Sequence, residues 1–307
     1  MSELEKMDFE GFKSGFVALL GKPNVGKSTL INHYIGQKIA AVSLKPQTTQ
    51  RRQLGIMTLE NAQIIFVDTP GLHSETYKLS EFINQEARYA LMDADLILFI
   101  VDGSQFPDHE DQRLAQEVVE KARNTKKLLV MNKIDLASPS ELANHEKAFN
   151  ELLNFDDHIH ISAIMAEDRA ALLSRIVQLL PAGPKYFPED QVTDINEREI
   201  AEDLIRAAAL TFLREEIPYG IFVRVDDYKP RENKIIYIHA TLIVERESHK
   251  GIVIGKGGSM IKEISTAARQ EIEEMSGQSV FLELKVKVEK NWRNDLNFLR
   301  RHGLSHD

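Results

Sequence analysis

One stretch near the start of the chain has the residue types and the spacing of a phosphate-binding loop. Residues 21–28, Gly-Lys-Pro-Asn-Val-Gly-Lys-Ser, match the pattern G-x-x-x-x-G-K-[ST] at every fixed position. In such a loop Lys27 would reach the β- and γ-phosphates of a nucleotide, and the Ser28 hydroxyl would hold Mg²⁺. The predicted nucleotide contacts here are Gly21, Asn24, Val25, Gly26, Lys27, Ser28 and Thr29.

The flanking residues predict the elements that must position this loop. Residues 15–20 are apolar and predict a buried strand, and residues 28–35 predict a helix. A strand, a glycine-rich turn and a helix N-terminus together form an anion site, because backbone N–H groups and the helix dipole both favour negative charge. The alternative is a glycine-rich turn that only connects a strand to a helix, and this context disfavours it.

A second motif predicts a magnesium contact beside the phosphates. Residues 62–68 predict a strand that ends at Asp68, and Thr-Pro-Gly follows at 69–71. A carboxylate at the strand tip can hold Mg²⁺ through water, and the Gly71 N–H can face a γ-phosphate. The motif alone is weak, since its residues are ordinary in turns, but it gains weight after a phosphate loop.

The polar segment 43–52 predicts a switch loop, which orders only when a γ-phosphate is present. It holds two adjacent threonines, and we choose Thr49 over Thr48 as the Mg²⁺ ligand. Its alternative is a plain surface loop.

A third and a fourth motif predict recognition of guanine. The Asp135 carboxylate can accept both guanine N1–H and the exocyclic amine, while Asn132 can donate to the O6/N7 edge. The stem of Lys133 can cover the ring, and the backbone of Ser162 and Ala163 can meet O6. The alternative for the third motif is a polar turn that caps a helix.

The strand before Ser162 also carries His158 and His160, a pair that suggests a metal. The sequence places no carboxylate or third histidine nearby in a position to complete a site, so no metal site is predicted there.

Taken in order, these four motifs resemble the GTPase domain of the translation-factor-related class. The forms G-x-P-N-V-G-K-S, Q-T-T and D-T-P-G resemble its Era-like group, over residues 15 to about 181. The resemblance implies an α/β P-loop fold with a mostly parallel sheet and hydrolysis of GTP to GDP and phosphate. The positions it assigns to catalysis are Lys27, Asn24, Thr49 and Gly71, with Ser28, Thr49 and Asp68 on the metal.

Some positions leave the mechanism open. Gln50 stands where the group has arginine, and Leu72 stands where many GTPases have a glutamine that orients water. Leucine cannot orient water, so slow intrinsic turnover is expected. In Era-like relatives the asparagine that corresponds to Asn24 can help hold K⁺ against the phosphates; the equally weighted alternative is that Asn24 only shapes the loop.

Three prolines within residues 181–188 end the first domain. We predict a GTPase domain at 1–181, a proline-rich linker at 182–195 and a second domain at 196–307. The second domain is predicted to run helix (196–216), strand (221–225), strand (234–244), helix, G-x-x-G loop, helix and strand (280–288).

This order and the Gly-Lys-Gly-Gly loop resemble an α+β type II KH domain, which binds RNA. Glycines let an RNA backbone approach closely, and lysines supply phosphate contacts. A lone G-x-x-G is often a mere helix–helix turn. The predicted RNA contacts are Lys250, Gly255, Lys256, Gly257, Gly258 and Lys262.

From residue 15 to about 303 the chain therefore resembles the Era family of bacterial GTPases. The resemblance implies binding of the 3′ end of small-subunit (16S) ribosomal RNA, the 30S subunit as partner, and a role in assembling that subunit. Peripheral association with the inner face of the cell membrane is implied by the resemblance alone. An alternative of another class is an RNA-binding module whose first domain senses nucleotide without significant turnover.

Composition agrees with a globular protein. The 307 residues are 43% hydrophobic, hold no cysteine and carry a net charge of −9, which argues against indiscriminate nucleic-acid binding. The acidic N-terminus has no apolar run, and the longest apolar runs, such as 96–101, are too short to span a bilayer. We therefore expect a cytoplasmic protein; the expected oligomeric state is a monomer.

Overall fold

The computed structural model describes residues 11–40, 52–68, 77–231 and 235–305. They form two compact units. The first contains the described residues of 1–35, 52–69 and 87–194, and the second contains those of 36–51, 70–86 and 195–307.

The first unit is built on a six-stranded sheet in the order β2-β3-β1-β4-β5-β6. Only β2 runs antiparallel to its neighbour, so the predicted α/β fold with a mostly parallel sheet is confirmed. The strands are β1 (Lys13–Leu20), β2 (Gln53–Thr58), β3 (Ala62–Asp68), β4 (Leu96–Asp102), β5 (Lys126–Asn132) and β6 (Asp157–His160). The helices are α1 (Lys27–Ile35), α3 (His109–Lys121), α4 (Pro139–Leu152) and α5 (Ala166–Leu179), together with residues 87–92 at the end of α2 (Lys78–Met92), whose first part belongs to the second unit.

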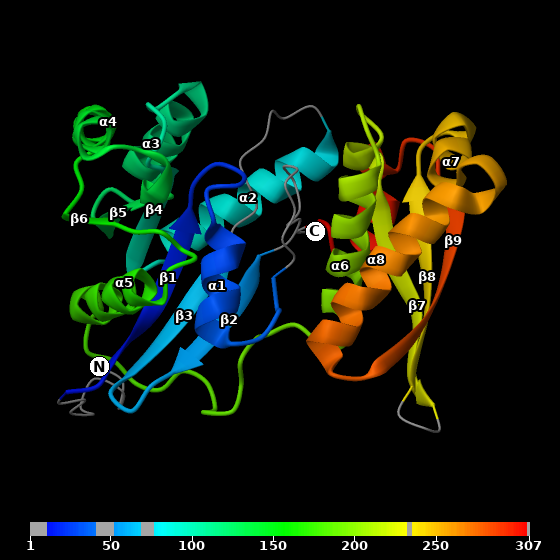
Figure 1. Cartoon of the computed structure of the whole chain (residues 1–307), viewed down its shortest axis with the longest axis horizontal. Helices are drawn as coiled ribbons and strands as arrows, with labels where there is room; N and C mark the ends of the chain where they lie inside the picture. Colours follow the sequence, from blue (N-terminus) through cyan, green and yellow to red (C-terminus); the bar gives the residue numbers. More distant parts are fainter. Residues whose placement is uncertain (1–10, 41–51, 69–76, 232–234, 306–307) are drawn as a thin grey trace. The chain divides into compact units, whose positions relative to one another are not determined.

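Both faces of this sheet are covered, which explains why its strands are continuous apolar runs. Along β3, Phe66 stacks on Tyr34 of α1, with ring centroids 5.3 Å apart, and α1 lies in front of the sheet in Figure 1. Its neighbours Ile65 and Val67 point the other way and share a buried cluster with Ala90 of α2. The alternation of side chains along one strand thus places helices on opposite faces.

The proline-rich segment is held firmly by the first unit. Gln63 Oε1 accepts hydrogen bonds from the backbone N–H of Tyr186 (2.7 Å) and Phe187 (3.0 Å). Further along, the Ile56 N–H of β2 donates to the Val192 carbonyl at 2.8 Å. The segment predicted as a linker therefore follows the edge of the sheet, and the second unit takes over at residue 195.

The second unit has the predicted α+β order. Its elements are α6 (Glu197–Phe212), β7 (Phe222–Arg231), β8 (Ile235–Val244), α7 (Glu247–Ile254), α8 (Ser259–Ser276) and β9 (Ser279–Val288). The sheet order is β7-β8-β9, with β7 antiparallel and β9 parallel to β8, and α6 and α8 lie together in front of it (Figure 1).

Two element boundaries differ from the prediction by several residues. Helix α6 ends at Phe212 rather than near 216, because Leu213 adopts an extended backbone. Strand β7 runs well beyond residue 225, because a β-bulge between Val225 and Asp227 absorbs one residue and the ladder continues.

A short C-terminal element was not predicted. Helix α9 (Leu296–Arg301) follows Trp292, whose side chain is fully buried. The indole N–H donates to the Gly220 carbonyl at 3.2 Å, and the ring packs against Phe222 and Phe298. The same cluster takes in Leu79, Phe82 and Ile83 from the first part of α2. None of the helices in the described ranges is long and apolar enough to cross a bilayer.

We expect Trp292→Ala to lower the free energy of unfolding by about 3–5 kcal/mol, because it opens a cavity and leaves the Gly220 carbonyl without its donor. Leu296→Ala, at a side chain that is 43% exposed on the adjacent helix, should change it by less than about 1 kcal/mol. Urea melts followed by circular dichroism measure both, and equal losses in the two variants would contradict this packing.

Candidate functional site

The phosphate loop follows β1 and opens α1, as predicted. The Lys27 ammonium donates to the backbone carbonyls of Gly21 (2.6 Å) and Lys22 (2.8 Å). Burial lowers the pKa of Lys27 to about 8, although the charges of Asp68 and Glu110 oppose this. The lysine that should meet phosphate thus lies inside its own loop, within reach of carboxylates.

The residues predicted to hold Mg²⁺ partly converge. Ser28 Oγ lies 3.3 Å from Asp68 Oδ2, and Asp68 is buried at the tip of β3. A hydroxyl and a carboxylate oxygen are hard ligands of the kind that Mg²⁺ takes, so these two residues fit the ion. Thr49, Gly71 and Leu72 lie outside the described residues.

Two loop positions have backbone geometry that the chemistry requires. Gly26 has φ +106°, and a Cβ there would fall on the Asn132 amide nitrogen. Asn24 is exposed with φ +65°, a left-handed conformation that asparagine tolerates better than most residues. Thr29 lies in the first turn of α1.

Asn132, at the end of β5, joins the phosphate loop to the base-recognition loop. Its amide nitrogen donates to the Val25 carbonyl at 2.7 Å, and its amide oxygen accepts from the Ala163 N–H at 2.8 Å. The side chain is almost fully buried. Sequence reasoning assigned Asn132 to the guanine edge; the structure gives it a bracing role, and its contact with guanine remains a prediction.

The remaining base-recognition residues lie together. Ser162 Oγ donates to Asp135 Oδ1 at 2.6 Å, which places the predicted guanine acceptor beside the predicted O6 loop. From α5, Asp168 accepts from the Ser162 N–H at 2.7 Å, and Arg169 donates to the Ala163 carbonyl at 2.9 Å. Sequence reasoning missed both α5 residues, because neither belongs to a motif.

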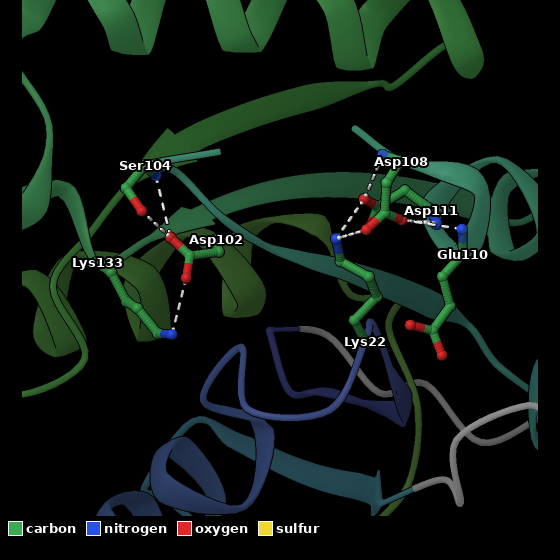
Figure 2. A network of polar contacts seen from close by, with 7 residues as sticks. All are labelled: Lys22, Asp102, Ser104, Asp108, Glu110, Asp111 and Lys133. Atoms are coloured by element: carbon green, nitrogen blue, oxygen red, sulfur yellow. Dashed lines mark hydrogen bonds and ion pairs between the residues drawn. The ribbon is translucent and has the colours of Figure 1, made fainter. Parts of the chain in front are cut away.

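Lys133 is fixed by a partner that the sequence did not reveal. Its ammonium lies 2.8 Å from Asp102 Oδ2, and Ser104 donates to Asp102 Oδ1 through its hydroxyl (2.6 Å) and its N–H (3.0 Å), as Figure 2 shows. Burial opposes ionisation of Asp102, but these hydrogen bonds hold its pKa below the ordinary value. Lys133 itself has φ +63°, so both backbone and side chain are constrained.

The two histidines of β6 have a carboxylate between them after all. Glu146 of α4 lies 2.5 Å from His160 Nε2 and 3.4 Å from His158 Nε2. Sequence proximity could not show this, because Glu146 comes from another element. Within the described ranges no group of three histidine, cysteine or acidic side chains has a geometry that could hold a metal ion.

The G-x-x-G loop connects α7 to α8. Gly255, Gly257 and Gly258 have φ of +74°, +61° and +81°. Gly257 occupies one of the two x positions of the G-x-x-G pattern, and it too has a left-handed backbone. Lys256 and Lys262 are exposed, and Lys250 is half-buried on α7.

Comparisons with known proteins match both parts of the chain. Residues 16–133 match the family model described as 50S ribosome-binding GTPase, and residues 216–293 match the KH domain model. GTPase Era of Caldicellulosiruptor saccharolyticus is 45% identical over 295 residues, 95% of this chain and 97% of that protein. The chain belongs to the GTPase Era family. GTPase Era of Caldanaerobacter subterraneus subsp. tengcongensis is also 45% identical, over 96% of this chain and 99% of its own.

Solved Era structures share the whole fold. The crystal structure of Era in complex with MgGDPNP and nucleotides 1506–1542 of 16S ribosomal RNA superposes with a TM-score of 0.87 at 36% identity, covering 96% of this chain and 99% of that one. The crystal structure of an Aquifex aeolicus Era variant bound to GDP·AlF4⁻ gives the same TM-score and identity, over 96% of this chain and all of that one. The Era resemblance drawn from the motifs is therefore confirmed over nearly the full length.

The lowered pKa of Lys27 has a measurable consequence. Above about pH 8 Lys27 is mostly neutral before nucleotide binds, so binding of GDP should take up a proton, and the affinity for GDP should fall as pH rises from 7.5 to 9. The expected loss is about three- to tenfold, measured by titration with a fluorescent GDP analogue. Lys27→Arg, whose cation does not titrate, should show a flatter profile. A GDP affinity that does not change with pH in the wild type would contradict the lowered pKa of the buried Lys27.

Proposed function

We propose that this chain is a GTP-hydrolysing switch that binds the 3′ end of 16S ribosomal RNA and assists assembly of the small ribosomal subunit. The observation that carries the proposal is the pairing, in one chain, of a phosphate loop joined by Asn132 to the Asp135–Ser162 pair with a loop of positive-φ glycines on a KH fold. The Era relative with the same two domains was crystallised with MgGDPNP and this part of 16S RNA.

Hydrolysis would transfer the γ-phosphoryl group of GTP to water, giving GDP and phosphate. The Lys27 ammonium would leave the carbonyls of Gly21 and Lys22 and bind the phosphate oxygens. Ser28 and Asp68 would hold Mg²⁺, which neutralises charge on the phosphates. We assign Thr49 and the Gly71 N–H to the switch side of the site.

Guanine selectivity would rest on Asp135. With Ser162 Oγ donating to one carboxylate oxygen, the side chain is held as an acceptor beside the Ala163 loop. Asn132 fixes that loop relative to the phosphate loop. Base and phosphates would therefore be bound by parts of one rigid framework, with Lys133 held alongside by Asp102.

RNA binding would use the turn between α7 and α8. The glycine positions present backbone without side chains, and Lys256 and Lys262 add exposed cations. A KH domain clamps about four nucleotides this way. A local cationic turn on a chain with a net charge of −9 suits selective rather than indiscriminate binding. We further infer a cytoplasmic monomer; the membrane association that the resemblance implies plays no part in the proposal.

The alternative, an RNA-binding module that senses nucleotide without significant turnover, is favoured only by Leu72. Measuring steady-state GTP hydrolysis with and without a 16S 3′ fragment separates the two. A switch should turn over GTP measurably and respond to the RNA, whereas a sensor should bind GTP and RNA with no turnover under either condition.

Replacing Lys256 and Lys262 with glutamate should abolish binding of a single-stranded 16S 3′ fragment, with a loss of about 100-fold or more, because two cations at the phosphate backbone become two like charges. The matched control replaces Lys285 and Lys287 of β9, which are both 61% exposed in the same domain, with the same net charge change. GTP binding should be unchanged in both variants. Equal RNA affinity in the two would show that the loop is only a helix–helix turn.

K⁺ dependence tests the role of Asn24. If its exposed amide helps hold a monovalent cation at the phosphates, hydrolysis should be about tenfold faster in KCl than in NaCl at equal ionic strength, and Asn24→Ala should remove the difference. Asn24→Gly keeps the left-handed backbone without the amide and separates coordination from loop shape. Equal rates in the two salts would rule the cation out.

A further inference from the structure

The second residue of the phosphate loop, a variable position of the motif, is built into an ion-pair cluster. The Lys22 ammonium lies 2.8 Å from Asp108 Oδ2 and 2.8 Å from Asp111 Oδ2, at the start of α3 (Figure 2). The Lys22 side chain is 12% exposed and that of Asp111 is fully buried. The Lys22–Asp111 pair is therefore shielded from solvent more than an ordinary surface ion pair, which contributes little, whereas the Asp108 side chain is 56% exposed.

The two aspartates are held in place independently of Lys22. Asp108 is the N-cap of α3, and its Oδ1 accepts from the N–H of Glu110 (2.9 Å) and Asp111 (3.2 Å). Asp111 in turn accepts from the Asp108 N–H at 3.0 Å, which completes a capping box. The carboxylates are thus fixed in position by the helix start, and a change at residue 22 would leave them there.

This acidic turn lies within electrostatic reach of the phosphate site. The charge of Glu110 acts on Lys27, the lysine that should meet the β- and γ-phosphates. Asp108, Glu110 and Asp111 together bring three carboxylates to a loop whose ligand is itself highly anionic. Lys22 neutralises part of that charge with a cation from the loop itself.

Lys22 also acts through its backbone. Its carbonyl is one of the two acceptors of the Lys27 ammonium, so the residue that is tied to α3 also holds the phosphate-binding lysine. A displacement of Lys22 would move both the local charge and the resting partner of Lys27.

We propose that Lys22 supports nucleotide binding by neutralising the acidic turn of α3 beside the phosphates. The proposal rests on nucleotide binding by this family and is independent of RNA binding. It assigns a role to a motif position that the sequence pattern leaves free.

The test compares the affinities of Lys22→Met for GTP and GDP at about 0.05 M and 0.5 M salt. With the acidic turn uncovered, GTP should bind about tenfold more weakly at low salt, GDP should lose less because it carries less charge, and both losses should shrink at high salt. Lys22→Arg should stay within about threefold of wild type. The matched control is Lys126→Met. Lys126 lies at the start of β5 and donates a hydrogen bond to the Leu179 carbonyl, so its loss should change neither the GTP nor the GDP affinity.

A second experiment removes the negative charge of the two aspartates. Adding Asp108→Asn and Asp111→Asn to Lys22→Met should restore affinity, because asparagine still caps the helix but carries no charge. With Lys22 intact, the two asparagines should tighten GTP binding a few-fold; this arm holds even if Lys22→Met fails to fold. A merely structural tie predicts equal losses for GTP and GDP, no salt dependence and no recovery in the triple variant, and that result would overturn the proposal.

Discussion

The nucleotide framework depends on one buried amide. Asn132 bonds the Val25 carbonyl with its nitrogen and the Ala163 N–H with its oxygen, so the phosphate loop and the base loop have a fixed separation. Both bonds are shielded from water, where a lost partner would be expensive. The absence of a side chain at Gly26 follows from this constraint, because the amide occupies the space that a Cβ would need. Glycine at position 26 is thus required by the position of the Asn132 side chain.

Each of the three lysines discussed in the nucleotide-binding unit is held by an oxygen of the protein. Lys27 rests on carbonyls of its own loop, Lys133 on Asp102, and Lys22 on two aspartates of α3. The KH loop differs, since Lys256 and Lys262 are exposed. A lysine held by neutral carbonyls can be drawn away by a phosphate, whereas one held by a buried carboxylate stays where it is. The first arrangement suits ligand contact and the second suits positioning.

The motifs predicted much of this architecture because they encode local geometry. The loop 21–28 requires a strand before it and a helix after it, and both are present as β1 and α1. The KH fold of the second domain was likewise predicted from the order of its helices and strands around the G-x-x-G loop. Partners from distant elements could not be predicted: Val25 lies 107 residues from Asn132, and Glu146 reaches the β6 histidines from α4. Helix α9 was missed because its apolar residues are few, and only the packed structure shows what Trp292 covers.

Trp292 is the single tryptophan of the chain, so its fluorescence comes from one of the two compact units alone. Its indole is fully buried beside Phe222 and Phe298, in the second compact unit, whereas a guanine nucleotide would sit in the first. Emission excited selectively from the indole therefore reports the integrity of the KH unit and its C-terminal segment. A nucleotide-borne fluorophore reports the other unit, so the cooperativity between the two is open to direct observation in one sample.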